Sequence, residues 1–515
     1  MWEAYKKKLA IMKKFSLIFL VLISMLTGIK AQNVDDALRY SQLFYNGTAR
    51  FNSMGGAFTA LGGDISSLSQ NPAGLGVFRS SEFTITPQLY HIKSRAQLFN
   101  KTSVDYLYNF NLAQAGIVVN LIKKENETGL LTLNFGYSFN RTNNFNQSTV
   151  IEGKSDHSSL LDSWAEKSDG WYSDELENNV YDAYLGWRTY LIDSLPGKST
   201  KYGTIYSNYG DDATTYGQNM KRIMTTTGFT GEHSFSIGGN YSNKLFFGAT
   251  LGITRINFES TIKHSESADG VLPSRYSAAG DGFTDFNYTY YYKNIGTGYS
   301  LKIGAIYRPI EILRIGFAFH SPMLYKIDEY NQDNLSSWFT DLADPIEVEN
   351  ESMRFNYALA TPFRAIVGAA LQIKKIALIS ADYEFIDYST SKFSETGDDY
   401  DYTFKNQEIK NTLQPVSNIR LGAEVRLSSI YLRGGYALYG SPWTTGDVNE
   451  DLNYNSLALG IGFREQNINV DFGFSRLTNH QNYILYSVED LEEVMTNMNI
   501  NRNMFTVTFG YKFGY

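Results

Sequence analysis

Segments in which apolar and polar residues alternate recur along the chain, and they restrict its fold more than any other feature. In one of them, Leu131, Leu133 and Phe135 alternate with Thr132 and Asn134. A period of two with one polar face is typical of a half-buried β-strand. Most of these segments span about 10–13 residues, whereas ordinary strands average about five or six and a tilted strand needs about 9–11 residues to cross a bilayer.

We count fourteen such segments, an even number. They lie near residues 83–92, 110–121, 129–141, 229–242, 245–258, 297–308, 312–322, 361–373, 376–388, 416–427, 430–439, 454–464, 467–477 and 503–515. Short turns join them in pairs at 122–128, 243–244, 309–311, 374–375, 428–429 and 465–466. Long connections separate the pairs at 93–109, 142–228, 259–296, 323–360, 389–415, 440–453 and 478–502.

This alternation of short turns and long loops is typical of an outer-membrane β-barrel, in which the short turns face the periplasm. The sequence therefore predicts an all-β fold, a transmembrane antiparallel β-barrel of about 14 strands. Residues 83–515 would form the barrel, and residues 142–228 would be its most prominent extracellular loop.

Two of the long loops carry helical signals. The first predicted helix is capped by Ser173 and ended by Pro196–Gly197, and its apolar residues follow helical spacing: Leu176, Val180, Tyr184, Trp187 and Leu191. A second, short helix is predicted from Ser487, with Asp490 completing a capping box. Such apolar stripes either pack a loop onto itself or form a hydrophobic groove that captures a ligand.

The N-terminus has the features of a secretory signal peptide. The basic stretch Met12 to Lys14 precedes a 12-residue apolar run from Phe15 to Leu26, which is too short to span a bilayer. We expect residues 1–31 to be removed near Ala31–Gln32, and we expect the mature protein in the cell outer membrane. A membrane anchor is the alternative, and whether translation starts at Met1 or Met12 stays open.

Charge and cysteine content narrow the possible partners. Without residues 1–31 the chain has 39 basic and 52 acidic side chains, a net charge near −13. It shows no basic patch with interleaved aromatic residues, so no nucleic-acid partner is expected. It has no Cys, which excludes disulfides and thiolate metal sites and fits export through an oxidising compartment.

Residues 32–82 precede the first alternating segment and do not alternate. They begin with a stretch that predicts a short helix, "NVDDALRYSQLF", and continue with several Gly pairs that allow tight turns and close backbone approach. No Gly-x-Gly-x-x-Gly follows a strand, and no Walker lysine is present, which argues against a phosphate loop. A segment of this kind suits a plug, or hatch, folded inside the barrel.

The stretch "GGAFTALGGDISSLSQNPAGLG" resembles the N-terminal signature of FadL/TodX-type outer-membrane transporters of hydrophobic compounds. In this resemblance Asn71, Pro72 and Ala73 match the Asn-Pro-Ala motif of the family's hatch, and Gly55 and Gly56 open the stretch. The resemblance implies a 14-stranded barrel with an N-terminal hatch, whose conformation the Asn-Pro-Ala motif would set. It also implies that a ligand leaves sideways through a gap in the wall.

Two later stretches, "RIGFAFHSP" (314–322) and "SADYEFIDYS" (380–389), resemble late-strand signatures of one branch of that family. Members of this branch are often labelled as hemin receptors.

No catalytic or metal-binding motif stands out. The six His residues are scattered without His-Glu-x-x-His spacing, and no Gly-x-Ser-x-Gly is present, so we expect no enzyme, no metal and no cofactor.

Strand alternation also assigns charged residues to the lumen, because Arg or Lys facing lipid at the bilayer midplane costs roughly 2–4 kcal/mol. The candidate lumen- or ligand-lining residues are Arg314, His320, Arg364, Arg420 and Arg426, and Asp382, Glu384, Glu424, Asp471 and Lys512 are expected on the same face. These residues either form a salt-bridged network that holds the hatch, or some of the Arg residues bind an acidic headgroup.

The leading functional hypothesis is passive outer-membrane transport of hydrophobic small molecules, fatty acids or aromatic hydrocarbons, through a hatch-gated barrel. The alternatives are a haem-binding outer-membrane receptor, with an axial His or Tyr in a loop, and a structural or adhesive barrel. Expected partners are outer-membrane lipid, a hydrophobic ligand, and the barrel-assembly machinery, which would read the aromatic C-terminal Tyr515. We expect a monomer. Ligand identity and lateral exit stay open.

Overall fold

The computed structural model describes residues 33–124, 128–207, 215–273, 282–350, 352–374, 376–397, 400–489 and 491–514. The predicted signal peptide (1–31) and Tyr515 lie outside these residues.

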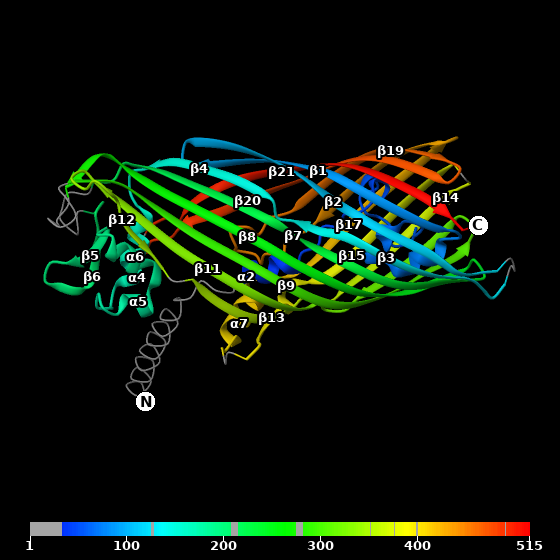
Figure 1. Ribbon diagram of the computed structural model, residues 1–515, viewed down its shortest axis with the longest axis horizontal. Helices are drawn as coiled ribbons and strands as arrows, with labels where there is room; N and C mark the ends of the chain where they lie inside the picture. Colours follow the sequence, from blue (N-terminus) through cyan, green and yellow to red (C-terminus); the bar gives the residue numbers. More distant parts are fainter. Residues whose placement is uncertain are drawn as a thin grey trace, which may run out of the picture.

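One antiparallel sheet closes on itself, because β1 pairs with β2 on one side and with β21 on the other (Figure 1). Fourteen strand positions surround the lumen, as predicted, and at four of them two successive strands share one position: β3 with β4, β10 with β11, β13 with β14, and β15 with β16. The barrel strands are β1 (Ser81–Leu98), β2 (Lys101–Lys123), β3 (Leu130–Asn144), β4 (Gln147–Ser155), β7 (Gln218–Tyr241), β8 (Leu245–Pro273), β9 (Gly282–Ile310), β10 (Leu313–His320), β11 (Leu324–Phe339), β13 (Met353–Ala360), β14 (Arg364–Ile373), β15 (Ala377–Asp387), β16 (Lys392–Glu395), β17 (Pro415–Leu427), β18 (Ile430–Tyr439), β19 (Tyr454–Glu465), β20 (Ile468–Tyr486) and β21 (Val494–Phe513).

Several strands continue far beyond the segments that the sequence predicted. The stretches 93–109 and 259–296, expected as loops, are mostly the outer halves of the hairpins β1–β2 and β8–β9, and 323–360 contains β11, β12 (Ile346–Glu349) and β13. Outside the bilayer the outward face turns polar while the inward face stays apolar. In β9, for example, Asn287 is exposed and Phe286 and Tyr288 are buried, and we had read this stretch as loop.

The helix predictions are correct at the N-terminus and partly wrong in the loops. The predicted helix near residue 34 is α2 (Val34–Ser41), capped by the Asn33 side chain. The helix predicted after Ser173 is split into α5 (Leu176–Asn179) and α6 (Tyr181–Arg188). Residues 487–489 are not helical, and Asp490 lies outside the described residues.

Around the half of the barrel that carries the short turns, the outward side chains form an apolar belt. Phe317, Val367, Leu421 and Leu459 are 46–58% exposed, and comparable residues follow on the other strands. An exposed belt of this kind is what a bilayer-spanning barrel presents to lipid. Within the described ranges, no helix is both long enough and apolar enough to cross a membrane.

The N-terminal segment, residues 33–80, fills the lumen (Figure 1). It contains α2, α3 (Ala49–Ser53) and the short 3-10 helices η1 (Ile65–Ser69) and η2 (Pro72–Val77). The wall meets it with a ring of glycines, at each of which an added Cβ would approach the segment to less than 3.0 Å: Gly116, Gly136, Gly248, Gly304, Gly316, Gly368, Gly422, Gly435, Gly460 and Gly473. The segment is therefore seated in direct contact with wall backbone, and we call these residues the glycine ring.

A small module, residues 158–206, covers the end of the barrel opposite the short turns (Figure 1). It consists of α4 (Leu160–Ser168), α5, α6 and the hairpin β5 (Ile192–Leu195) and β6 (Lys198–Thr204), and Trp164 packs with Phe283 and Phe286 of the wall in one buried cluster. The wall residue Glu266 accepts hydrogen bonds from Ser159 Oγ (2.6 Å) and Leu160 N (2.9 Å) at the start of α4. We call this unit the cap module.

Burial also shifts the pKa of two side chains, one in the cap module and one on the wall strand β8 beside it. It raises the pKa of Asp162 to about 6, and it lowers the pKa of His264, which lies beside Arg222 and Glu266 on the extended wall.

Candidate ligand cavity

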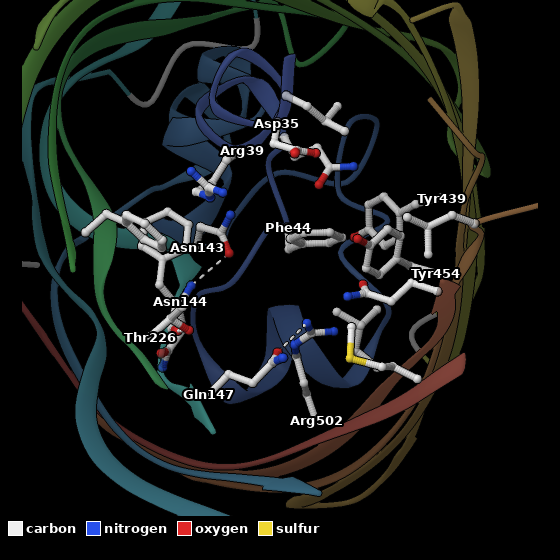
Figure 2. A pocket seen from close by; sticks show the side chains of 18 of the residues that line it. Asp35, Arg39, Phe44, Asn143, Asn144, Gln147, Thr226, Tyr439, Tyr454 and Arg502 are labelled. Atoms are coloured by element: carbon white, nitrogen blue, oxygen red, sulfur yellow. Dashed lines mark hydrogen bonds between the residues drawn. The ribbon is translucent and has the colours of Figure 1, made fainter. Parts of the chain in front are cut away.

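A cavity of about 800 Å³ lies in the lumen between the N-terminal segment and the barrel wall. Helix α2 and the residues that follow it form one side, and the inner faces of wall strands form the others. Figure 2 shows side chains from the two chain ends and from the middle of the chain pointing towards its centre: Asp35, Arg39, Phe44, Asn143, Asn144, Gln147, Thr226, Tyr439, Tyr454 and Arg502.

One side of the cavity is aromatic. The ring of Phe44 lies 5.2 Å from that of Tyr439 and 4.9 Å from that of Tyr454, with the rings tilted or edge-on to one another. Leu477 and Met504 pack with this group. Aromatic rings offer a large apolar surface that binds other apolar groups without a fixed hydrogen-bonding pattern.

Elsewhere the lining mixes further aromatic rings, such as Phe145 and Phe258, with polar and cationic side chains, of which Figure 2 labels Arg39 and Arg502. The guanidinium of Arg502 donates hydrogen bonds to the side chains of Asn479 (2.6 Å) and Gln147 (3.1 Å). Both partners are neutral amides, so these contacts do not neutralise the positive charge of Arg502. Arg39 instead pairs with Asp36 and lies 4.4 Å from the ring of Phe258. The cavity can therefore hold an apolar body against its aromatic side and a polar or anionic group near Arg502.

The predicted hatch motif lies at the base of the N-terminal segment, against the wall. Asn71 caps η2 through Ala73 N (3.0 Å) and donates to Thr59 O (2.6 Å). The Pro72 carbonyl touches Gly248 of the glycine ring, and Asn71 touches Gly304. Of the other predicted hatch residues, Gly55 and Gly56 border the cavity and both adopt positive φ, 62° and 72°, which favours glycine.

The five predicted lumen- or ligand-lining residues do not line this cavity. Arg314 donates to Leu61 O (2.8 Å), and His320 hydrogen-bonds Gln70 O (2.7 Å), so both hold backbone of the N-terminal segment. Arg426 is exposed at a short turn and donates to Ser428 O (3.0 Å).

Arg364 and Arg420 both donate hydrogen bonds to one carboxylate that does not line the cavity. Glu384 accepts from Arg364 at 2.6 Å and from Arg420 at 2.5 Å, and Arg364 also donates to Ser41 O at the end of α2. His320 and Arg364 border a second cavity of about 20 Å³, room for about one water molecule. In the part of the chain that the structure describes, no three His, Asp or Glu residues are placed to hold a metal ion.

Sequence reasoning missed other buried ion pairs that hold the same segment. Lys302 pairs with Glu232 and donates to Ser69 O (2.8 Å). Arg50, in α3, pairs with Glu424 of the wall at 3.0 Å, and Arg433 joins this pair. The alternation could have placed Lys302, Glu232 and Arg433 in the lumen. It could not have paired them, because β8 separates Lys302 from Glu232, and the Glu424 that Arg433 contacts on the adjacent strand also binds Arg50 of the N-terminal segment.

The wall has a gap that reaches the cavity. The β2–β3 ladder ends at Gln114–Asn140, and residues 101–113 of β2 pair with β1 alone, whereas β4 pairs with β7. At the edge of this gap Arg141 donates to Leu112 O (3.2 Å) and lies 4.0 Å from the ring of Phe229. Arg141 lines the cavity although it follows the outward-facing residues of β3, so the cavity extends to the wall at this point.

No protein-family model and no curated relative matches the sequence. Solved structures match it over most of its length. A Pseudomonas aeruginosa FadL homologue aligns with a TM-score of 0.54 at 12% identity, covering 92% of this chain and 99% of the homologue. The P. putida toluene transporter TodX aligns with a TM-score of 0.50 at 11% identity, covering 92% of this chain and 100% of TodX. These matches give no support to the hemin-receptor branch, and at these identities the likeness shows only that the chain shares the fold of these barrels.

Proposed function

We propose that this protein lets hydrophobic small molecules cross an outer membrane by diffusion, and that it is a transporter and not an enzyme. The proposal rests mainly on the cavity, which has an aromatic side and reaches the gap in the wall at Arg141. The fold neighbours include a toluene transporter, which agrees with this class of ligand. The apolar belt supports a position in the bilayer.

A sideways exit fits the geometry better than passage past the N-terminal segment. That segment touches the glycine ring around the wall and is held by buried hydrogen bonds from Lys302, Arg314 and His320. Displacing it would break these contacts together. Leaving through the gap would disturb fewer contacts, namely the Arg141–Leu112 hydrogen bond and the contact between Arg141 and the Phe229 ring. We therefore place the exit between β2 and β3, near the upper edge of the apolar belt.

Filling the cavity should abolish ligand binding. Ser475 is buried on the cavity wall, and Ser475→Trp would place an indole beside Met504 and Leu477. We expect binding of palmitate or toluene to weaken at least tenfold, about 1.4 kcal/mol or more. Titration of detergent-extracted protein by calorimetry or probe displacement measures this, and the probe that binds identifies the ligand class.

The matched control is Leu457→Trp, on the lipid-facing side of β19, where the side chain is already 60% exposed. It should leave binding within twofold of the wild-type value. Equal losses in the two variants, or none in Ser475→Trp, would remove the cavity as the binding site.

Cross-linking the gap should separate uptake from binding. The β2–β3 register, if it continued past Gln114–Asn140, would place Leu112 opposite Thr142, and neither residue lines the cavity. In this Cys-free chain, Leu112→Cys with Thr142→Cys can be joined by a short bifunctional maleimide. We expect cellular uptake of the ligand to fall at least tenfold while its affinity in detergent changes less than twofold.

The control for the cross-linked gap joins Asn331→Cys and Met353→Cys, which are partners in an intact ladder between β11 and β13. This link should not change uptake. Uptake that survives the first cross-link would rule out exit through the gap, without bearing on the cavity.

A further inference from the structure

Basic side chains occupy alternate strands in one row on the outer face of the wall. The row runs through successive cross-strand partners: Arg141, Gly231, Arg255, Thr297, Lys326 and Ala358, on β3, β7, β8, β9, β11 and β13. Because neighbouring strands lie about 4.8 Å apart, the basic residues recur about every 9.6 Å. The residues between them are small, which leaves room for a group between two cations.

The row lies directly above the apolar belt. The next row towards the short turns contains Ile253, Tyr299 and Leu324, and the last two are 56% and 61% exposed. Lys392, on β16, continues this lower row through its partner Ala360. The cations therefore stand where lipid headgroups meet the acyl chains, with an exposed Tyr at the same boundary.

These charges are not neutralised by the protein. Arg255, Lys326 and Lys392 are exposed, and among the described residues none of the three forms an ion pair. Farther from the short turns on the same face, Lys293 does form an ion pair, with Glu259 at 2.6 Å. In a chain with a formal net charge of −8, an unpaired basic row at this level marks a surface built for an anionic partner.

We propose that Arg255 and Lys326, together with Lys392 of the adjacent lower row, bind the phosphate groups of lipid headgroups in the outer leaflet. From here on, these three residues are called the basic row. Guanidinium and ammonium groups bind phosphate through charge-assisted hydrogen bonds. A lipid fits better than a free anion, because its acyl chains would lie on Tyr299 and Leu324 immediately below. This contact is outside the cavity and does not depend on transport.

The test is native mass spectrometry of the full chain in detergent with added lipid A bearing two phosphates. We expect the wild-type protein to retain lipid A and to bind its dephosphorylated form, or phosphatidylcholine, at least tenfold more weakly. The triple variant Arg255→Gln, Lys326→Gln and Lys392→Gln should lose at least tenfold in affinity for the phosphorylated form. Arg255→Lys with Lys326→Arg keeps the charge and should keep the binding.

A matched variant removes three exposed lysines elsewhere, Lys198→Gln, Lys244→Gln and Lys374→Gln, and should bind lipid A within twofold of wild type. Equal losses in the two triple variants would overturn the proposal, because binding would then follow net charge and not position. Full competition by an excess of inorganic phosphate would assign the basic row to a free anion instead. No preference for the phosphorylated lipid would also overturn it.

Discussion

Gly435→Ala and Gly248→Ala are expected to dislodge the N-terminal segment from the barrel wall. A Cβ on Gly435 would meet the backbone of Met54 and Gly55, and one on Gly248 would meet the backbone of Pro72 and its neighbour, all at less than 3.0 Å. Backbone atoms cannot turn away as the end of a side chain can, so the segment or the strand must shift. Overpacking of this kind costs roughly 1–3 kcal/mol, and occasionally more.

The neighbouring residue supplies the control for this experiment. A Cβ on Gly434 would find only Leu459 Cδ2, at 4.0 Å, so Gly434→Ala should behave as wild type. Because the chain has no Cys, Ser67→Cys can report on the seating of the segment, in which Ser67 is fully buried. We expect rapid maleimide labelling in the Gly435→Ala and Gly248→Ala backgrounds and protection in Gly434→Ala. Equal protection in all three would show that the segment is not held by close packing.

The barrel was predictable from sequence because its signal is local and repeated. A lipid-facing strand must alternate over its whole membrane span, so Ile419, Leu421 and Ala423 indicate a strand without knowledge of their partners. The segment 33–80 was recognisable for a related reason, since it lacks alternation and is rich in glycine. The glycine ring that contacts this segment could not be predicted, because Gly248 and Gly304 become partners only when β8 pairs with β9.

The cavity was much harder to predict than the fold. Phe44 follows α2, whereas Tyr439 ends β18 and Tyr454 begins β19, and no sequence pattern joins these distant positions. Arg502 lies just before the segment that alternation had marked as the last strand. Charged residues inside the marked strands, such as Arg314 and Arg364, were the visible candidates. They lie near the level of the N-terminal segment and donate hydrogen bonds to it.

Removing the carboxylate of Glu384 is expected to have the largest effect on stability of any single substitution here. Its two oxygens accept from Arg364 and Arg420, all three side chains are buried, and the Arg420 guanidinium also lies over the Tyr45 ring at 4.8 Å. Glu384→Ala would leave the two guanidinium groups without the one carboxylate that both of them contact. Breaking a buried ion pair from one side costs about 3–5 kcal/mol.

We expect Glu384→Ala to lower the urea midpoint at which the extracted barrel loses its heat-resistant migration on gels. Asp269→Ala, which breaks the exposed pair with Lys154, should leave that midpoint unchanged. The double variant Glu384→Gln with Arg420→Met should recover part of the loss, because it removes one of the two stranded charges along with the carboxylate. If the double variant is instead less stable than Glu384→Ala, the cost lies in lost packing and not in uncompensated charge.

Glu384→Ala should also affect the ligand cavity. Because Arg364 donates a hydrogen bond to Ser41 O, we expect this substitution to loosen the end of α2 and to weaken ligand binding in the cavity that α2 lines.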